Sequence, residues 1–280
     1  MKITAFLTDL IAKGHCCFTF AQAKEALGVS DIAARATLRR LKQKGELAHP
    51  LSNFYVIVPP EYRVLGCRPA DHFIHELMQF IGTSYYVGLL SAAQYHGAAH
   101  HRPQQFQIMI NQKRRPIICG RIKIVFITKK NAEQTPTQNF NTSQGAIVVS
   151  TPEATAIDMV TYPHRCGGLD NVLTVLTDLV KKMDAAKLQQ LASATAEVTW
   201  IQRLGYLLDL IKANNLSEIL QKSLENHRVR ARTLIALPKK SVALEELSFK
   251  LGKAKNQSSR EAKKNDKWKL IINKKLELEK

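Results

Sequence analysis

The stretch Ser30–Gly45, with the sequence SDIAARATLRRLKQKG, decides the fold of the N-terminal part of the chain. It opens on a serine, where a helix N-cap is expected, and it closes on a glycine, where a helix is expected to end. Between them Ala34, Leu38 and Leu41 recur with the spacing of one helical face. We therefore predict a helix over residues 31–44 whose apolar stripe packs inward.

The opposite face of this predicted helix carries small and basic side chains. Alanines allow a helix to approach another surface closely, while arginine and glutamine reach base edges and phosphates. Such a face is typical of a recognition helix in the major groove of DNA. An ordinary helix with a solvated basic face is the alternative interpretation. The residues that we predict to contact DNA from this segment are Ser30, Ala33, Ala36, Thr37, Arg39, Arg40, Gln43 and Lys44.

The segments on either side favour a winged helix-turn-helix. Two amphipathic helices are predicted upstream, over residues 3–12 and 20–27, and a glycine follows each of them closely. Downstream, residues 46–49 and 54–58 have strand character around a Pro50-Leu51-Ser52-Asn53 turn. In folds with this order the hairpin tip reaches the backbone or the minor groove of DNA. We therefore predict that the wing contacts DNA through His49, Ser52 and Asn53.

The rest of the chain follows a predicted linker at residues 60–70 and has mixed patterns. Two helices are expected first, at residues 71–81 and 85–96. Short strands follow at residues 106–110, 122–128 and 146–149. Helical periodicity dominates from residue 152 onward. The predicted fold class is therefore α+β: an N-terminal winged helix-turn-helix followed by a larger mixed domain with a small sheet and a mostly helical C-terminal half.

The chain carries a large positive charge. Its 280 residues include 41 Lys and Arg against 23 Asp and Glu, which gives a net charge of +18. Nucleic acid is the commonest partner of such proteins, because phosphate binding releases condensed counterions. No acidic residue occurs between Glu76 and Glu133, so this stretch is predicted to form a secondary basic surface that contacts either phosphates or an acidic protein, with a solvated basic face as the alternative. Its residues are Arg102, Lys113, Arg114, Arg115, Arg121 and Lys123.

Catalytic and metal-binding patterns are weak. Metal-dependent nucleases place paired carboxylates beside their central sheet, and only Glu153 and Asp158 follow the predicted strands closely. A nuclease fused to a winged helix is the alternative that these two carboxylates leave open. His96, His100 and His101 lack an HExxH pattern, which disfavours a zinc site. We expect no catalytic residues, no metal and no cofactor, and therefore a protein that is not an enzyme.

Targeting patterns and cysteines indicate the compartment. The N-terminus lacks the apolar core of a signal peptide, and no apolar run approaches the ~20 residues of a membrane helix. The five cysteines are odd in number and have no CxxC spacing, which favours reduced thiols. We therefore expect a cytoplasmic protein.

Several segments beyond residue 84 carry a family resemblance. The most specific is YYVGLLSAAQYHGAAH at residues 85–100. It is accompanied by Arg102-Pro103-Gln104, STPEATAIDM at residues 150–159, QRLGYLL at residues 202–208 and WKLIIN at residues 268–273. Together with the predicted winged helix, these segments resemble the AbiEi family of antitoxins and transcriptional regulators from type IV toxin–antitoxin systems.

The resemblance implies two domains: residues 1–65 as a winged helix-turn-helix DNA-binding domain and residues 70–280 as a C-terminal antitoxin domain. The first domain is expected to repress its own operon by binding inverted repeats in the double-stranded DNA of the promoter. The second is expected to counteract a nucleotidyltransferase toxin encoded beside it, without requiring a stable complex. DNA contacts from both domains are compatible with the resemblance. A basic scaffold protein that binds an acidic partner is the remaining alternative.

Overall fold

The computed structural model describes residues 2–99, 103–225, 227, 229–235 and 263–276. The chain divides into two compact units, of which the first holds residues 1–95 and 99–154 and the second holds residues 96–98 and 155–280. Over the residues described, none of the helices has the length and apolar character needed to span a membrane. The first unit combines a winged helix with a larger sheet, and the second is mainly helical.

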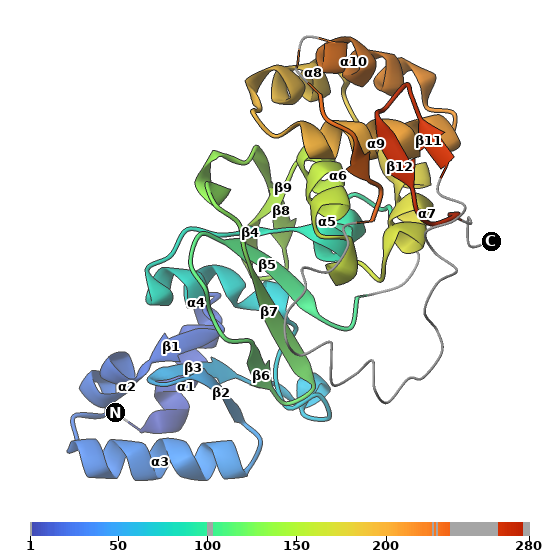
Figure 1. Ribbon diagram of the computed structural model, residues 1–280. Coiled ribbons are helices and arrows are strands. Elements are labelled where there is room, and N and C mark those ends of the chain that lie inside the picture. The colour runs from blue at the N-terminus through green and yellow to red at the C-terminus, as the bar shows by residue number, and fades with distance from the viewer. Residues whose placement is uncertain (1, 100–102, 226, 228, 236–262, 277–280) are drawn as a thin grey trace, which may run out of the picture. The chain divides into compact units, whose positions relative to one another are not determined.

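The N-terminal segment is a winged helix-turn-helix, as predicted (Figure 1). Its elements are α1 (Ile3–Ala12), β1 (Cys17–Thr19), α2 (Phe20–Leu27), α3 (Asp31–Gln43), β2 (Leu47–Leu51) and β3 (Phe54–Ile57). The three strands form an antiparallel sheet in the order β1-β3-β2. The strand β1 was not predicted from the sequence, because three residues directly before a helix cap give no periodic pattern.

Both faces of this three-stranded sheet are buried. Leu47 and Tyr55 pack on one face against the helices of the winged helix. Ala48 and Val56 point the other way and join the core of the rest of the first unit. Because successive strand residues face opposite sides, a strand buried on both faces is apolar throughout. This accounts for the continuous burial of Phe54–Val58.

A six-stranded mixed sheet forms the remainder of the first unit. Its strands are β4 (Tyr86–Val87), β5 (Phe106–Ile110), β6 (Ile117–Cys119), β7 (Ile122–Thr128), β8 (Thr137–Thr142) and β9 (Gly145–Ser150). The order is β6-β7-β5-β4-β9-β8, with parallel pairing for β5 with β7 and β4 with β9 and antiparallel pairing elsewhere. Helix α4 (Ile74–Ile81) packs against β9, and α5 (Leu89–Tyr95) packs against β5 and β9. The sheet therefore has a helical cover and a core between the two layers.

Three predicted elements of this unit differ from the structure. The predicted helix at 85–96 begins as β4, and only its later part is the helix α5. The predicted helix at 71–81 is split into a 3-10 turn (Ala70–His72) and α4. The sheet has six strands where three were predicted, because β4 and β6 are only two and three residues long and β8 is polar, so none of them gives a periodic apolar pattern. Two further 3-10 turns cover Pro60–Tyr62 and Ala132–Gln134.

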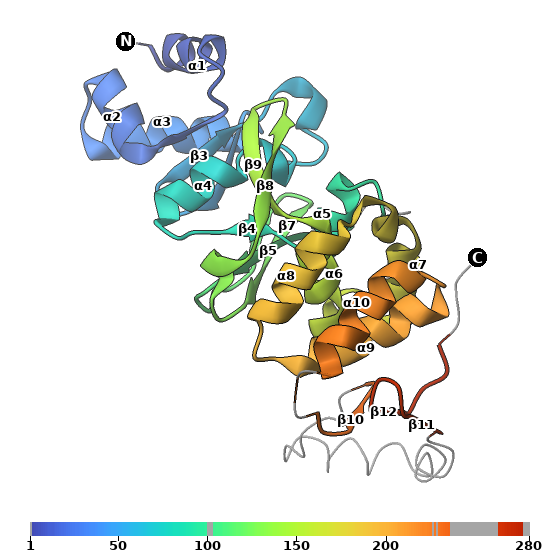
Figure 2. The same ribbon diagram turned by 90° about the horizontal axis from the view of Figure 1, so that it is seen from above.

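The second unit is mostly helical, as predicted. Its helices are α6 (Pro152–Thr161), α7 (Leu169–Leu179), α8 (Ala185–Ala194), α9 (Val198–Leu210) and α10 (Asn214–Glu225). Helix α6 belongs to this unit from Thr155 onward. Short 3-10 turns cover Pro163–Arg165 and Val180–Lys182. Helix α10 packs against both α8 and α9 (Figure 2). A small sheet in the order β10-β12-β11 follows, formed by β10 (Arg232–Thr233), β11 (Lys263–Asn265) and β12 (Leu270–Ile272).

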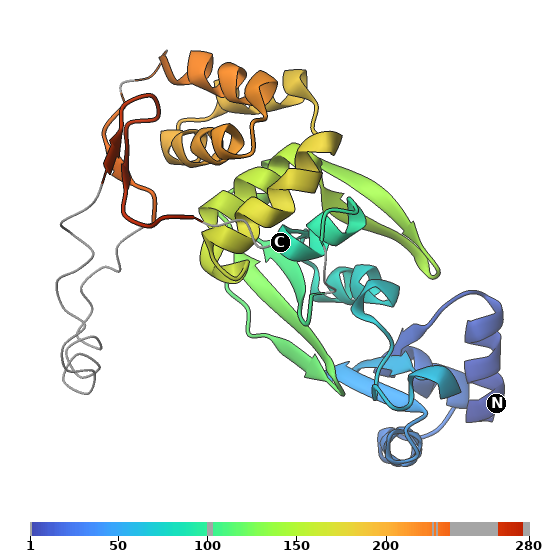
Figure 3. The same cartoon turned by 90° about the vertical axis from the view of Figure 1, so that its right-hand side faces the viewer.

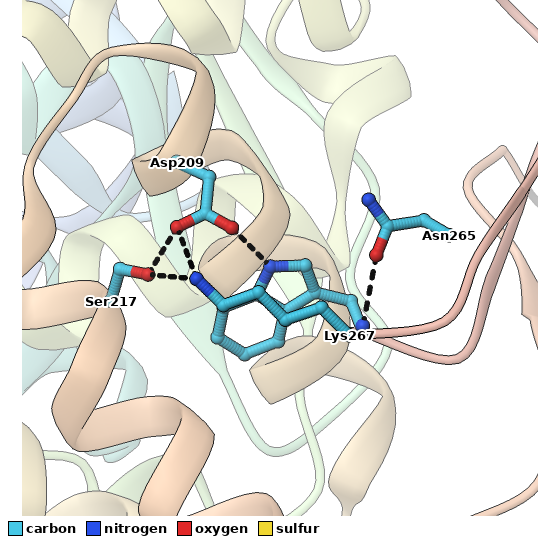
Figure 4. Close-up of polar contacts among 5 residues, drawn as sticks. Asp209, Ser217, Asn265 and Lys267 are labelled. Atoms are coloured by element: carbon cyan, nitrogen blue, oxygen red, sulfur yellow. Dashed lines mark hydrogen bonds and ion pairs between the residues drawn. The ribbon is translucent and has the colours of Figure 1, made fainter.

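A buried tryptophan attaches this small sheet to α9. The Trp268 side chain is fully buried, and its Nε1 donates to the Asp209 carboxylate at 2.6 Å (Figure 4). The same carboxylate accepts from the Ser217 hydroxyl and from Lys267 Nζ, the latter at 2.8 Å. Gln202 donates to the Trp268 carbonyl at 3.0 Å. These bonds explain why the strands coloured red lie beside the helices coloured orange in Figure 3.

Candidate nucleic-acid interface

Local side-chain caps define the helix-turn-helix. Thr19 and Gln22 form a capping box at the start of α2, with the Thr19 amide donating to Gln22 Oε1 at 2.7 Å. Gly28 ends α2 in the left-handed region at φ 62°, which glycine adopts without steric cost. The Ser30 hydroxyl then accepts from the Ala33 amide at 3.4 Å and begins α3. The turn between the two helices is therefore fixed by sequence-local contacts.

The buried stripe of α3 is the predicted one. Ala34, Leu38 and Leu41 are 0%, 1% and 7% exposed and belong to the winged-helix core. Their burial sets which side chains point outward. Thr37 is half-buried, and its hydroxyl donates to the Ala33 carbonyl at 2.9 Å. The other residues predicted to contact DNA from this helix and its ends are exposed: Ser30, Ala33, Ala36, Arg39, Arg40, Gln43 and Lys44.

The charge on α3 is positive and its one acidic residue is paired. The helix carries four basic residues against Asp31, whose carboxylate lies 2.6 Å from Lys24 Nζ on α2. The hydrogen bond from Lys24 lowers the pKa of Asp31. Arg35 lies over the Phe20 ring at 4.1 Å and so packs against the start of α2. The arginines at positions 39 and 40 are left on the exposed side of the helix.

One residue of this face was missed by sequence reasoning. Ile32 is 83% exposed, although it is a large aliphatic residue on an otherwise well-packed helix. It stands four residues before Ala36 and seven before Arg39, on the line opposite the buried stripe. Val29, in the turn just before α3, is 40% exposed. The helical spacing alone places Ile32 on this outward face, since it lies opposite Ala34, Leu38 and Leu41.

The wing places its predicted contact residues in two different environments. Ser52 and Asn53 are exposed at the hairpin tip, where Asn53 has φ 61° and its carbonyl accepts from the Phe20 amide at 2.8 Å. His49 is half-buried instead, with its ring stacked on Tyr55 at 4.6 Å. Burial, followed by nearby positive charges, lowers the pKa of His49, so the imidazole is held neutral. The imidazole therefore stabilises the wing strands by packing.

A basic loop, formed by residues 113–115, lies beside the wing. A shallow depression is lined by Pro50 and Leu51 of the wing and by residues 114–118, and β2 runs next to β6 (Figure 1). Arg114 lies over the Phe126 ring at 5.7 Å and is half-buried. Lys123 is also half-buried, and Arg102 lies outside the described residues. The exposed members of the predicted secondary basic surface are Lys113, Arg115 and Arg121.

Comparison with known families assigns both parts of the chain. Residues 6–58 match the family model described as a transcriptional regulator, AbiEi antitoxin. Residues 86–210 match the model described as the AbiEi antitoxin C-terminal domain. The chain belongs to the AbiEi antitoxin family. The resemblance carried by residues 85–100 is thereby confirmed, and with it the regulator and antitoxin assignment and DNA binding as a property of the family.

A solved structure shares the fold of this AbiEi chain. The crystal structure of the RV2827C protein from Mycobacterium tuberculosis superposes with a TM-score of 0.65 over 96% of this chain and 90% of that chain. The two sequences are 18% identical, so the likeness concerns the fold alone. A comparison with curated proteins finds no match.

The side chains considered for catalysis or metal binding are mostly buried in this AbiEi protein. Glu153 and Asp158 are each 1% exposed on α6, and His96 is 8% exposed. Among the residues that the structure describes, no three His, Cys, Asp or Glu side chains are grouped as metal ligands would be. His100 and His101 lie outside those residues. The family names describe an antitoxin and a regulator rather than an enzyme.

Proposed function

We propose that this AbiEi antitoxin represses its own operon by binding inverted repeats in the promoter through α3. The exposed face of α3 carries the proposal, since it presents small residues with Arg39, Arg40 and Gln43 opposite a fully buried stripe. Small residues allow close approach, and arginine and glutamine make the bidentate contacts that distinguish guanine and adenine in the major groove. The exposed wing tip at Ser52 and Asn53 then lies against the adjacent backbone or minor groove.

The basic loop extends this proposed interface along the DNA backbone. Arg115 is exposed at the depression beside the wing, and Lys113 is exposed two residues before it, in the same unit as α3. Phosphate contacts fix the position of a protein on the duplex and carry no sequence information themselves. The loop therefore adds affinity, and α3 adds sequence preference.

The test of autorepression is a salt titration of binding. Purified protein is titrated against the DNA directly upstream of its gene and against a scrambled duplex of equal length. We expect tighter binding to the upstream DNA by a factor of about 10³ or more, with the affinity for both duplexes falling steeply as salt rises. Equal affinity for both duplexes at every salt concentration would contradict a sequence-specific repressor and would favour a protein as the partner.

We further propose that residues 70–280 act as the antitoxin domain, in the cytoplasm, against a nucleotidyltransferase toxin encoded beside this gene. The match of residues 86–210 to the antitoxin C-terminal domain supports this proposal. Co-expression of the two genes tests it: growth is expected to be restored by the full chain and by a variant with Arg40→Ala, because that substitution affects the proposed DNA contact alone. A growth defect that persists with the full chain would contradict the proposed toxin.

A further inference from the structure

The exposed isoleucine on α3 belongs to an ordered line of side chains. Ile32, Ala36, Arg39 and Gln43 follow one another at intervals of four, three and four residues, so they form a ridge along one side of the helix. All four are exposed, and the ridge lies opposite the stripe that begins at Ala34. Ile32 is the large apolar member of the ridge, and it stands at the N-terminal end.

In helix-turn-helix proteins the N-terminal residues of the recognition helix contact base edges. In this chain α3 has the position of the recognition helix. Ile32 is the second residue of α3, and its side chain is 83% exposed. Ala36, the next residue along the ridge, is small and leaves the isoleucine methyl groups unshielded on that side. The Lys24–Asp31 ion pair and the Ser30 cap fix the backbone beneath it. The side chain is therefore presented on the first turn of a capped helix.

The positive charge of α3 and of the whole chain indicates which partner covers the Ile32 side chain. Arg35, Arg39 and Arg40 occupy the same helix, and the chain as a whole has a net charge of +18. A second copy of the chain would bring the same positive helix against this one, which electrostatic repulsion disfavours. Duplex DNA is negatively charged, and its major groove holds one apolar feature, the C5-methyl group of thymine.

We propose that Ile32 contacts the C5-methyl group of a thymine and is a specificity-determining residue of this AbiEi antitoxin. The proposal rests on the proposed DNA-binding function and adds a base identity to it. Contact between two apolar groups excludes water from both, and this favours thymine over cytosine at the contacted position. Arg39 and Gln43 lie farther along the same ridge, over neighbouring base pairs.

The experiment removes the methyl group from the DNA and the side chain from the protein. Duplexes are first enriched from a random pool by the wild-type protein, and each thymine of the enriched duplex is then replaced by deoxyuridine. We expect one or two of these replacements to weaken wild-type binding by about threefold to fivefold, the value for one buried methyl group. With Ile32→Ala the same replacements are expected to have no effect. Ile32→Ala is expected to fold normally, because alanine is the better helix former at an exposed position.

A matched control uses the exposed isoleucine of another helix. Ile11 on α1 is 50% exposed, and Ile11→Ala is expected to keep the full sensitivity to deoxyuridine. The proposal is overturned if the wild type selects a sequence but no deoxyuridine changes its affinity, or if Ile32→Ala retains the loss. A dimer that dissociates on Ile32→Ala, measured by light scattering without DNA, would assign the residue to self-association instead. Failure of the wild type to enrich any sequence would overturn the proposed function itself, and this inference with it.

Discussion

Gly205 and Trp268 meet at a contact that has no room for another carbon atom. A Cβ added at Gly205 would lie 2.1 Å, 2.2 Å and 2.6 Å from three ring carbons of Trp268. Glycine in a helix costs about 1 kcal/mol relative to alanine. Without the contact to Trp268, Gly205→Ala would therefore stabilise α9. The Trp268 ring is fully buried, so moving it aside displaces its neighbours, and overpacking of this kind costs about 1–3 kcal/mol or more. We expect Gly205→Ala to lower the melting temperature in calorimetry.

The partner substitution separates this clash from a general weakening of the helix. Trp268→Phe removes part of the ring, so the double variant with Gly205→Ala is expected to lose less stability than the sum of the two single variants. A coupling free energy of about 0.5–3 kcal/mol is typical of residues in contact. Additive losses would show that the close contact is relieved elsewhere in the protein.

We expect Asp209 to make the stability of the second unit dependent on pH. Burial raises the pKa of Asp209, but the hydrogen bonds from Lys267, Ser217 and Trp268 outweigh it, and the pKa lies below its ordinary value. A carboxyl with a lowered native pKa contributes stability above the unfolded value of about 4, and loses it as the pH falls through the native value. Asp209→Asn is expected to cost about 1–3 kcal/mol at pH 7, because the buried donors lose a charged acceptor.

Calorimetry between pH 7 and pH 3 checks this expectation. The melting temperature of the wild type should fall more steeply below about pH 4 than that of Asp209→Asn, which has no carboxyl to protonate at this position. Asp9→Asn is the control, since the Asp9 ion pair with Lys13 is exposed and surface pairs contribute about 0–1 kcal/mol. Parallel acid profiles for wild type and Asp209→Asn would show that the carboxylate is not the acid-sensitive group.

At the scale of the element, α3 is the helix on which sequence preference depends. Arg40 is exposed on its outer face, and the loss of a good base contact costs about 1–3 kcal/mol. We expect Arg40→Ala to weaken binding to the upstream DNA by about 5-fold to 150-fold and to affect random DNA much less. Band-shift titration measures both, with Lys13→Ala, at the C-cap of α1, as a control that removes the same charge. Unchanged affinity for both duplexes would contradict the assignment of Arg40 to the interface.

The elements that could be predicted from the sequence are those fixed by contacts within them. Helix α3 carries its own cap, stripe and terminating glycine, so its bounds agree with the prediction to one residue. The strands β4 and β8 carry no such signal. Tyr86 and Val87 are strand residues because β5 and β9 pair with them, and the side chains of β8 are largely exposed and polar. The pairing of β4 depends on strands distant in the chain, whereas β8 forms a hairpin with β9, the next strand. Neither strand has an apolar periodicity that would have predicted it.

The residues of the candidate interface also divide into those that local sequence patterns predict and those that tertiary contacts decide. The outward face of α3 followed from its buried stripe, so Arg39, Arg40 and Gln43 could be selected from the sequence. His49 was selected because it stands near the predicted turn, but stacking on Tyr55 decides its environment, and stacking is a tertiary contact. The neighbourhood of the wing and residues 114–118 spans more than 60 positions and could not be derived from local patterns.

At the scale of the molecule, the winged helix is not an isolated module. Val56 and Ala48 of its sheet share a core with the strands and helices of the larger sheet, so α3 and the basic loop belong to one compact unit. Because α3 and the basic loop are parts of one packed unit, they approach DNA together. The position of the loop at residues 113–115 relative to the wing is therefore set by packing rather than by a linker.

The last prediction concerns the number of phosphates that this unit contacts. Each phosphate neutralised by a lysine or arginine contributes about −0.9 to the slope of log affinity against log salt concentration. If Lys113 and Arg115 each contact one phosphate, Lys113→Ala with Arg115→Ala lowers the magnitude of this slope by about two, and weakens binding to upstream and random DNA alike. Lys182→Ala with Lys187→Ala removes the same charge from exposed positions of the second unit and is the matched control. A slope that is equal for the two double variants would assign the loop to an acidic protein surface and leave DNA contact to α3 and the wing.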